Sequence, residues 1–135
     1  MGKVIVVVDD NPANLKLLKM FLSKEGYDVR TATDGPEVLP LVERVRPDLI
    51  LMDIHLPTLD GLEVTRRLKA GDSTREIPVL AVTAYAMKGD DEKALAAGCD
   101  GYITKPIQMN ELLETVGRLC ANRSATGPAT KNPLL

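Results

Sequence analysis

The fold is decided by the stretch Pro47-Asp48-Leu49-Ile50-Leu51-Met52-Asp53-Ile54-His55-Leu56-Pro57. Four consecutive apolar residues lead into one carboxylate and then into a loop bounded by proline, a pattern typical of a strand that is buried on both faces and ends at Asp53. In an open parallel sheet, ligands and chemistry gather beyond the carboxyl ends of the strands. Asp53 is therefore the first candidate functional residue, and the other strands should bring its partners.

Short apolar runs alternate with amphipathic segments on both sides of this stretch. They predict five strands, over residues 3–8, 27–32, 49–53, 77–82 and around 102–103. The segments between and after them predict five helices, over about residues 12–26, 34–46, 60–70, 87–97 and 109–121. This alternation is the pattern of an α/β fold, with a doubly wound five-stranded parallel sheet and five flanking helices.

Helix-start signals precede three of the predicted helices. They are an N-cap at Asn11 and two capping boxes, Asp34 with Glu37 and Asp60 with Glu63. Pro40 lies inside the second predicted helix, where its ring and its missing N–H should kink or tighten the chain.

Length and composition indicate one ordinary soluble domain, with 135 residues of which 44% are hydrophobic and 27% charged. We assign residues 1–121 to this domain and expect residues 122–135, which lack periodicity, to be a disordered tail or a linker stub. The net charge of −2 favours neither nucleic acid nor an anionic membrane. No apolar run approaches a membrane span, and Met1 leaves no room for a signal peptide before the first strand. A cytoplasmic protein with Cys99 and Cys120 as reduced thiols is expected.

Right-handed crossovers place the ends of consecutive parallel strands at one edge of the sheet. This edge should collect five polar side chains: Asp9, Asp10, Asp53, Thr83 and Lys105. Crowded carboxylates repel each other unless a cation lies between them, and oxygen ligands without His or Cys support suit Mg²⁺. With such an ion, Asp53 would be the nucleophile for a transferring phosphoryl group, and Lys105 and Thr83 would each bind a phosphoryl oxygen.

A family resemblance now becomes visible in motifs that stand in order, each at a strand end. They are Asp9-Asp10, Leu51-Met52-Asp53-Ile54-His55-Leu56-Pro57 with Asp60-Gly61, Thr83-Ala84 and Lys105-Pro106. Together they resemble the receiver domain of two-component response regulators, the CheY-like superfamily, over about residues 3–121. Residues 82–90 and 103–107 are especially similar to DivK-type single-domain regulators and to receivers of hybrid histidine kinases. The resemblance implies a flavodoxin-like sheet with the strand order 2-1-3-4-5.

The resemblance also implies metal and acceptor roles, position by position. Asp53 corresponds to the phosphoacceptor, Asp10 to a direct Mg²⁺ ligand, and Asp9 to a ligand that acts largely through water. His55, two residues after the acceptor, would bind the ion through its backbone carbonyl, so its imidazole is not required for metal binding. Mn²⁺ is an alternative ion.

A conformational switch is implied by three further positions. Lys105 would pair with the acceptor, and its bond to Pro106 is typically cis in the family. On phosphorylation Thr83 would move to the phosphoryl group, and Tyr102 would turn inward into the vacated space. This movement would reshape the face made by the fourth helix, the fifth strand and the fifth helix.

The function implied by the resemblance is two-component signal transduction. A sensor histidine kinase or a histidine phosphotransfer protein would dock near the first helix and pass its phosphoryl group to Asp53. The reshaped face would then control binding to a downstream protein target, without direct contact with nucleic acid or membrane. The chain would catalyse its own phosphorylation and dephosphorylation without being a turnover enzyme, as a monomer or a weak homodimer.

Several alternatives stay open beside this interpretation. A hydrolase of the haloacid dehalogenase type would need a second Asp two residues after the nucleophile, where His55 stands, and a flavodoxin-like cofactor site would be repelled by Asp9 and Asp10. The chain could also be a receiver that binds partners without phosphorylation, or it could lack an effector domain that follows residue 121. Asp9 and Asp10 could merely favour the positive end of the first helix. His55 and Tyr85 depart from the polar or acidic residues common at their positions and should affect the lifetime of the phosphoryl group.

Overall fold

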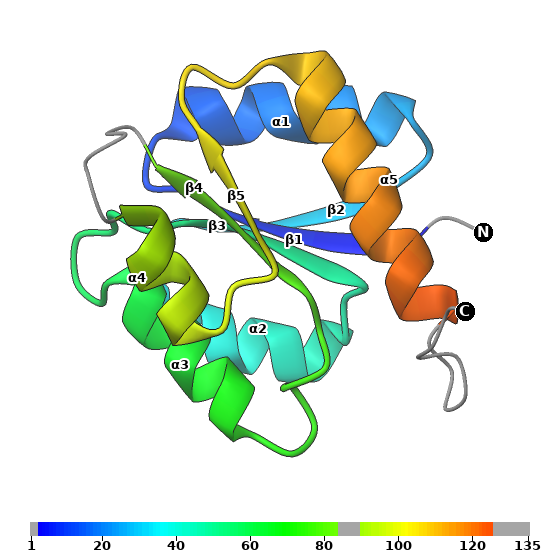
Figure 1. Ribbon diagram of the computed structural model, residues 1–135. Coiled ribbons are helices and arrows are strands. Elements are labelled where there is room, and N and C mark those ends of the chain that lie inside the picture. Colours follow the sequence, from blue (N-terminus) through cyan, green and yellow to red (C-terminus); the bar gives the residue numbers. More distant parts are fainter. Residues whose placement is uncertain (1–2, 84–89, 126–135) are drawn as a thin grey trace.

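The computed structural model of the chain describes residues 3–83 and 90–125 (Figure 1). Within these residues, five strands form one sheet in the order β2-β1-β3-β4-β5, and all four pairings are parallel. The strands are β1 (Val4–Val8), β2 (Asp28–Ala32), β3 (Leu49–Asp53), β4 (Val79–Thr83) and β5 (Gly101–Thr104). The predicted fold class and strand order are thereby confirmed.

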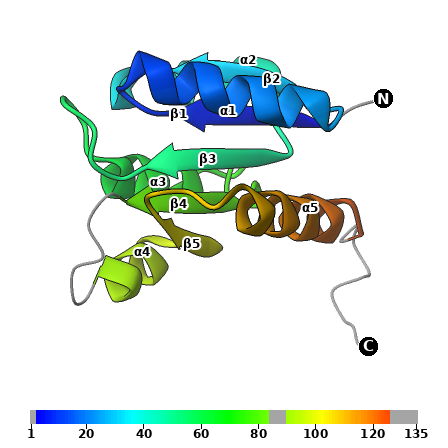
Figure 2. The ribbon, with the colours of Figure 1, turned by 90° about the horizontal axis from the view of Figure 1, so that it is seen from above.

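Helices cover both faces of this sheet, as the crossover rule requires. They are α1 (Pro12–Lys24), a 3₁₀ turn η1 (Gly35–Glu37), α2 (Val38–Val45), α3 (Gly61–Ala70), α4 (Asp90–Ala97) and α5 (Met109–Ala125). Figure 1 shows α1 and α5 on one face, and α2, α3 and α4 on the other. Figure 2 looks down onto the face that carries α1 and α5 and shows the strands side by side beneath them.

Burial follows the position of each strand in the sheet. β3 and β4 are buried at all five positions, because helices cover both faces of these central strands. The edge strand β2 leaves three of its five residues exposed. Alternate strand residues face two separate cores: Ile5 and Leu51 pack with α1 and α5, whereas Val6 and Met52 pack with α2, α3 and α4. The buried strands β3 and β4 end at the carboxyl edge, where the candidate residues were predicted.

The predicted N-cap at Asn11 is confirmed, and the helix start predicted at Asp60 is confirmed in part. The Asn11 side chain accepts hydrogen bonds from the N–H groups of Ala13 and Asn14, at 2.9 and 3.2 Å. Asp60 accepts one from Leu62 at 2.7 Å and so begins α3. Glu63 does not close a capping box there; its carboxylate instead pairs with arginines one turn further along, Arg66 and Arg67.

The capping box predicted from Asp34 and Glu37 does not form. The Asp34 carboxylate accepts hydrogen bonds from the N–H groups of Gly35 and Thr58, at 2.7 and 3.1 Å. Glu37 binds the N–H and the hydroxyl of Thr33, outside the helix. The chain therefore enters α2 through a 3₁₀ turn, and Pro40 lies in the first α-helical turn, where a missing N–H interrupts few hydrogen bonds.

Several boundaries differ from the predicted ones, most of them by one or two residues, and three of the differences concern β4 and the expected tail. β4 begins at Val79 because Pro78 has no N–H for the ladder, and it includes Thr83 as its last residue. α5 continues four residues past the predicted end at 121, to Ala125, so the first part of the expected tail is helical. The remainder of that tail, residues 126–135, and residues 87–89 of the fourth predicted helix lie outside the described residues. The Lys105–Pro106 peptide bond is cis, as expected.

Candidate functional site

Five polar side chains stand at the carboxyl edge of the sheet, each placed by the end of a strand. β1 leads into Asp9 and Asp10, β3 ends at Asp53, β4 ends at Thr83, and Lys105 follows β5. Asp9, Asp53 and Thr83 are buried, with exposed fractions of 2%, 5% and 0%. Buried polar groups require partners, so the contacts between these side chains define the site.

Asp9 is held by hydrogen bonds from the start of α1. Its Oδ1 accepts the N–H of Asn11 at 2.9 Å, and its Oδ2 accepts the Asn14 side-chain amide at 3.4 Å. Oδ2 also accepts a hydrogen bond from Lys105 Nζ at 3.2 Å. The carboxylate is thus fixed in orientation by the positive end of a helix and by a lysine. The role of Asn14 was not predicted, because a polar residue on the first turn of a helix has no special pattern in the sequence.

Asp53 lies between a backbone amide and the same lysine. Its Oδ1 accepts the N–H of His55 at 3.0 Å, and its Oδ2 lies 3.5 Å from Lys105 Nζ. Burial raises the pKa of the Asp53 carboxyl, although the His55 amide and the Lys105 charge act to lower it. The charges of Asp9 and Asp10 raise this pKa further. The ionised form of Asp53 is therefore held at a cost that a divalent cation would relieve.

Lys105 bridges the two buried acids. Partial burial acts to lower the pKa of its ammonium group, but the charges of Asp53 and Asp9 and the hydrogen bonds to them outweigh this effect, so the pKa is raised. The Lys105 N–H also donates to the Thr83 carbonyl at 2.7 Å, which fixes the backbone beyond β5 against β4. Lys105 therefore stays charged and stays in place.

Among the described residues, Asp9, Asp10 and Asp53 form a group that could hold a metal ion, with one carboxylate oxygen from each within 4.8 Å of the others. Asp10 is exposed and Asp9 and Asp53 are buried, so the group opens to solvent on one side. Hard carboxylate oxygens with room for water are the donor set that Mg²⁺ prefers. The residues thus fit the predicted ion.

For the predicted switch residues Thr83 and Tyr102, the structure gives positions and contacts but tests no movement. Thr83 Oγ1 lies 3.1 Å from His55 Nε2, a contact that no pattern in the sequence predicted. Tyr102 lies in β5 opposite Ala81 and packs, partly buried, against the core that includes α4. The proposed movements of Thr83 and Tyr102, and the His55 carbonyl as a metal ligand, stay predictions. Tyr85 lies outside the described residues.

Gly61 is a further residue that shapes the site. A Cβ atom there would meet the Asp53 carbonyl oxygen and would lie 2.7 Å from the Ile54 Cα. The absence of a side chain lets α3 begin directly against the end of β3, where the Gly61 N–H donates to the Ile54 carbonyl at 3.1 Å. Sequence reasoning noted Asp60-Gly61 as part of a motif, but the close approach that requires glycine is visible only in the fold.

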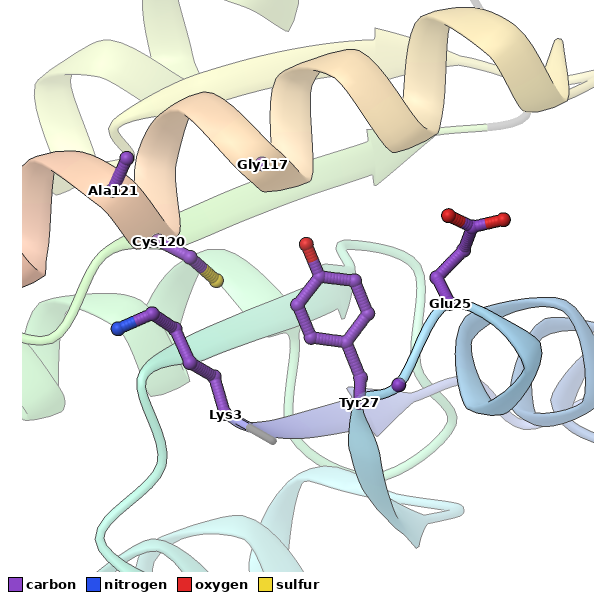
Figure 3. Close-up of a pocket in the computed structure, with 7 residues that line it drawn as sticks. Lys3, Glu25, Tyr27, Gly117, Cys120 and Ala121 are labelled. Carbon is purple, nitrogen blue, oxygen red and sulfur yellow. The ribbon is translucent and has the colours of Figure 1, made fainter. Parts of the chain in front are cut away.

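A cavity of about 470 Å³ lies at the opposite, amino edge of the sheet. Figure 3 shows Tyr27 pointing toward α5 there, between Lys3 and Glu25 and near Cys120. Burial raises the pKa of the Cys120 thiol to about 11, so this free cysteine is protonated at neutral pH and is no nucleophile. Cys120 therefore supplies no nucleophile to this cavity.

Comparison with known proteins defines the class. Residues 5–117 match the response regulator receiver domain, and the chain belongs to that family. It is 48% identical to the polar-differentiation response regulator DivK of Brucella anthropi over 116 residues, which cover 86% of this chain and 94% of that protein. DivK of Brucella ovis is 47% identical over the same length. The predicted family and its role in two-component signalling are confirmed.

Solved structures agree with this assignment. The receiver domain of the sensor histidine kinase PA1611 from Pseudomonas aeruginosa PAO1 superposes with a TM-score of 0.83 at 39% identity, covering 90% of this chain and 99% of that one. That structure has a magnesium ion coordinated in its active site cleft. A CheY-like response regulator receiver domain protein from Methanospirillum hungatei JF-1 superposes with a TM-score of 0.85 at 32% identity, covering 92% of this chain and 98% of that one.

Proposed function

We propose that Asp53 accepts a phosphoryl group from the phosphohistidine of a sensor kinase or a phosphotransfer protein. The observation that carries the proposal is the placement of a buried carboxylate, Asp53, 3.5 Å from Lys105 and within 4.8 Å of Asp9 and Asp10. This arrangement offers one nucleophile, one fixed positive charge and a ligand set for a divalent cation. Those are the components that phosphoryl transfer needs, because its catalysis is mostly positioning and charge neutralisation.

The transfer would proceed by in-line attack. An Asp53 carboxylate oxygen forms a bond to phosphorus while the bond from phosphorus to the histidine nitrogen breaks, and the histidine keeps that electron pair. Lys105 Nζ, held between two acids, would turn one donor to a phosphoryl oxygen, and the Thr83 hydroxyl would bind another. Hydrolysis reverses the modification, because water attacks the phosphorus and restores the Asp53 carboxylate with release of inorganic phosphate.

Mg²⁺ would be held by Asp9, Asp10, Asp53 and the His55 backbone carbonyl, with Mn²⁺ as an alternative. When bound, the ion neutralises the charge of the phosphoryl group and orients its oxygens. The magnesium in the receiver domain of PA1611 supports this assignment.

The partner would dock beside α1. Leu17 and Met20 are 43% and 54% exposed on this helix. A pocket of about 240 Å³ joins Leu17 to Lys105, Pro106 and Ile107, directly beside the acceptor site. An apolar patch next to a buried acceptor suits a helical partner that presents a phosphohistidine.

The output would be carried by the face of α4, β5 and α5. Leu95 on α4 is 63% exposed, and Tyr102 of β5 packs beside this helix. Movement of Thr83 would free space for Tyr102 and change that face for a downstream protein. The chain would act in the cytoplasm as a monomer or weak homodimer, without direct binding of nucleic acid. Among the helices described, none is long and apolar enough to cross a membrane.

Intact mass spectrometry tests the proposal. The chain is incubated with acetyl phosphate and Mg²⁺, and Asp53→Asn is the control. We expect a gain of one phosphoryl group, about 80 Da, that is absent in the control and without Mg²⁺. A wild-type protein that gains nothing under any condition would indicate a receiver that works without phosphorylation, and full labelling of Asp53→Asn would move the acceptor elsewhere.

A further inference from the structure

His55 contacts two residues of the site through different atoms. Its backbone N–H donates to Asp53 Oδ1 at 3.0 Å, and its ring nitrogen Nε2 lies 3.1 Å from Thr83 Oγ1. The backbone contact fixes the residue beside the acceptor, and the ring contact reaches from the loop after β3 to the end of β4. One residue thus joins the proposed acceptor to the proposed switch.

The ring contact matters because of where the Thr83 hydroxyl lies. Thr83 has an exposed fraction of 0%, whereas His55 is exposed, so the hydrogen bond joins a surface ring to a buried hydroxyl. A buried hydroxyl that loses a hydrogen bond is penalised, because no water replaces the partner. The contact therefore stabilises the orientation in which Thr83 stands in this structure.

We propose that His55 is a positioning residue that holds the Thr83 hydroxyl in the resting orientation. The proposal rests on the function proposed above, in which Thr83 turns to the phosphoryl group on Asp53. That turn exchanges the hydrogen bond to His55 Nε2 for one to a phosphoryl oxygen. The strength of the His55 contact then sets how much of the phosphoryl binding energy is needed to move the switch.

The first test measures the affinity for beryllium fluoride, a stable mimic of the phosphoryl group, in the presence of Mg²⁺. We expect His55→Leu to bind it about 2- to 10-fold more tightly than wild type, since one ordinary hydrogen bond no longer holds Thr83 back. His55→Gln keeps a polar group at similar reach and should restore an affinity near that of wild type. Unchanged or weaker binding by His55→Leu would overturn the proposal.

A double-mutant cycle separates this role from a direct effect of the ring on the mimic. In a Thr83→Val background the hydroxyl is absent, so adding His55→Leu should give no further tightening. Equal tightening in both backgrounds would mean that His55 acts on the phosphoryl group and not on Thr83, which contradicts the proposal.

A spectroscopic readout tests the contact without any phosphoryl chemistry. His55 is the one histidine of the chain, so its ring ¹⁵N signals need no assignment among several residues. Thr83→Val should shift these signals in the resting protein, and beryllium fluoride with Mg²⁺ should move the wild-type signals toward the same position. If the ring signals do not shift on Thr83→Val, or do not shift when beryllium fluoride and Mg²⁺ are added to wild type, the proposal is refuted. Failure of wild type to bind beryllium fluoride at all would instead refute the acceptor function, while the Thr83→Val comparison would still report the resting contact.

Discussion

At the scale of single residues, the ionised Asp53 carboxylate is destabilised by its surroundings. Burial raises the pKa of its carboxyl, and the charges of Asp9 and Asp10 act in the same direction. The unfolded chain releases the proton near the ordinary pKa of 3.8, whereas the folded chain releases it at higher pH. Protonation of Asp53 therefore favours the fold, and this contribution is lost as pH rises through the raised pKa.

Removing that charge should stabilise the metal-free protein at neutral pH. We expect Asp53→Asn to raise Tm by roughly 2–4 °C in EDTA at pH 7, the shift that about 1 kcal/mol gives a domain of this size. The advantage should shrink as pH falls toward 4, because wild-type Asp53 then becomes neutral as well. Asp72→Asn, at a side chain that is 94% exposed, is the matched control and should change little. A lower Tm for Asp53→Asn than for wild type in EDTA at pH 7 would show that the Asp53 charge does not destabilise the metal-free fold.

Lys105 supplies the positive charge that the ion would otherwise supply. Because Lys105 lies 3.2 Å from Asp9 and 3.5 Å from Asp53, it competes with Mg²⁺ for the same carboxylates. Lys105→Met should therefore bind Mg²⁺ about 2- to 10-fold more tightly, as expected for removal of one screened charge at this distance. It should bind beryllium fluoride at least about 10-fold more weakly, because a charged hydrogen bond is lost. Titration calorimetry measures both affinities. If Lys105→Met bound Mg²⁺ as well as beryllium fluoride more weakly, competition between Lys105 and the ion would be excluded.

At the scale of elements, the junction between β3 and α3 controls the acceptor loop. The site needs α3 to begin against the Asp53 backbone, and Gly61 is where the two segments meet. We expect Gly61→Ala to destabilise the fold by about 1–3 kcal/mol, because the added methyl group overlaps backbone atoms that cannot rotate away. Chemical denaturation measures the loss, and the phosphoryl gain from acetyl phosphate should fall with it.

Gly117 provides the control for that substitution. It lies within α5, and a Cβ there would meet one atom within 4 Å, the Tyr27 hydroxyl oxygen at 4.0 Å. Gly117→Ala should stabilise the protein by about 0.5–1 kcal/mol through helix propensity alone. Equal losses at both glycines would show that the methyl group at Gly61 does not act through the junction.

The exposed apolar side chains of helix α1 lead to a separate prediction about partner docking. Leu17 and Met20 are exposed, so Leu17→Asp and Met20→Asp should leave the fold intact. If phosphohistidine partners dock on this helix, both variants should lose about 10-fold or more in transfer rate from a phosphorylated partner, as truncations at interface centres do. Their labelling by acetyl phosphate should equal that of wild type, because the small donor needs no docking surface. A matched loss with both donors would place the defect in the site itself.

At the scale of the whole molecule, the sequence predicted the sheet and the edge but not the contacts made across it. The strands were visible because buried parallel strands are continuous apolar runs, and the acids were visible because each follows such a run. Their convergence followed from crossover handedness alone. Three contacts join distant segments: His55 with Thr83, the Thr58 N–H with the Asp34 carboxylate, and Gly61 with the end of β3. No local pattern records them, so they required the folded chain.

The same architecture links metal binding to global stability. The three acids come from β1 and β3, adjacent central strands that pair through four residues, so an ion held between them binds the folded chain and not the unfolded one. Mg²⁺ at 100 times its dissociation constant should stabilise the fold by about 2.7 kcal/mol, or roughly 10 °C in Tm. Asp10→Asn removes an exposed ligand at little cost to the metal-free fold and should abolish most of this rise. The measurement is thermal unfolding at constant ionic strength with Mg²⁺ or with NaCl, and a wild-type rise that NaCl reproduces would assign the effect to screening.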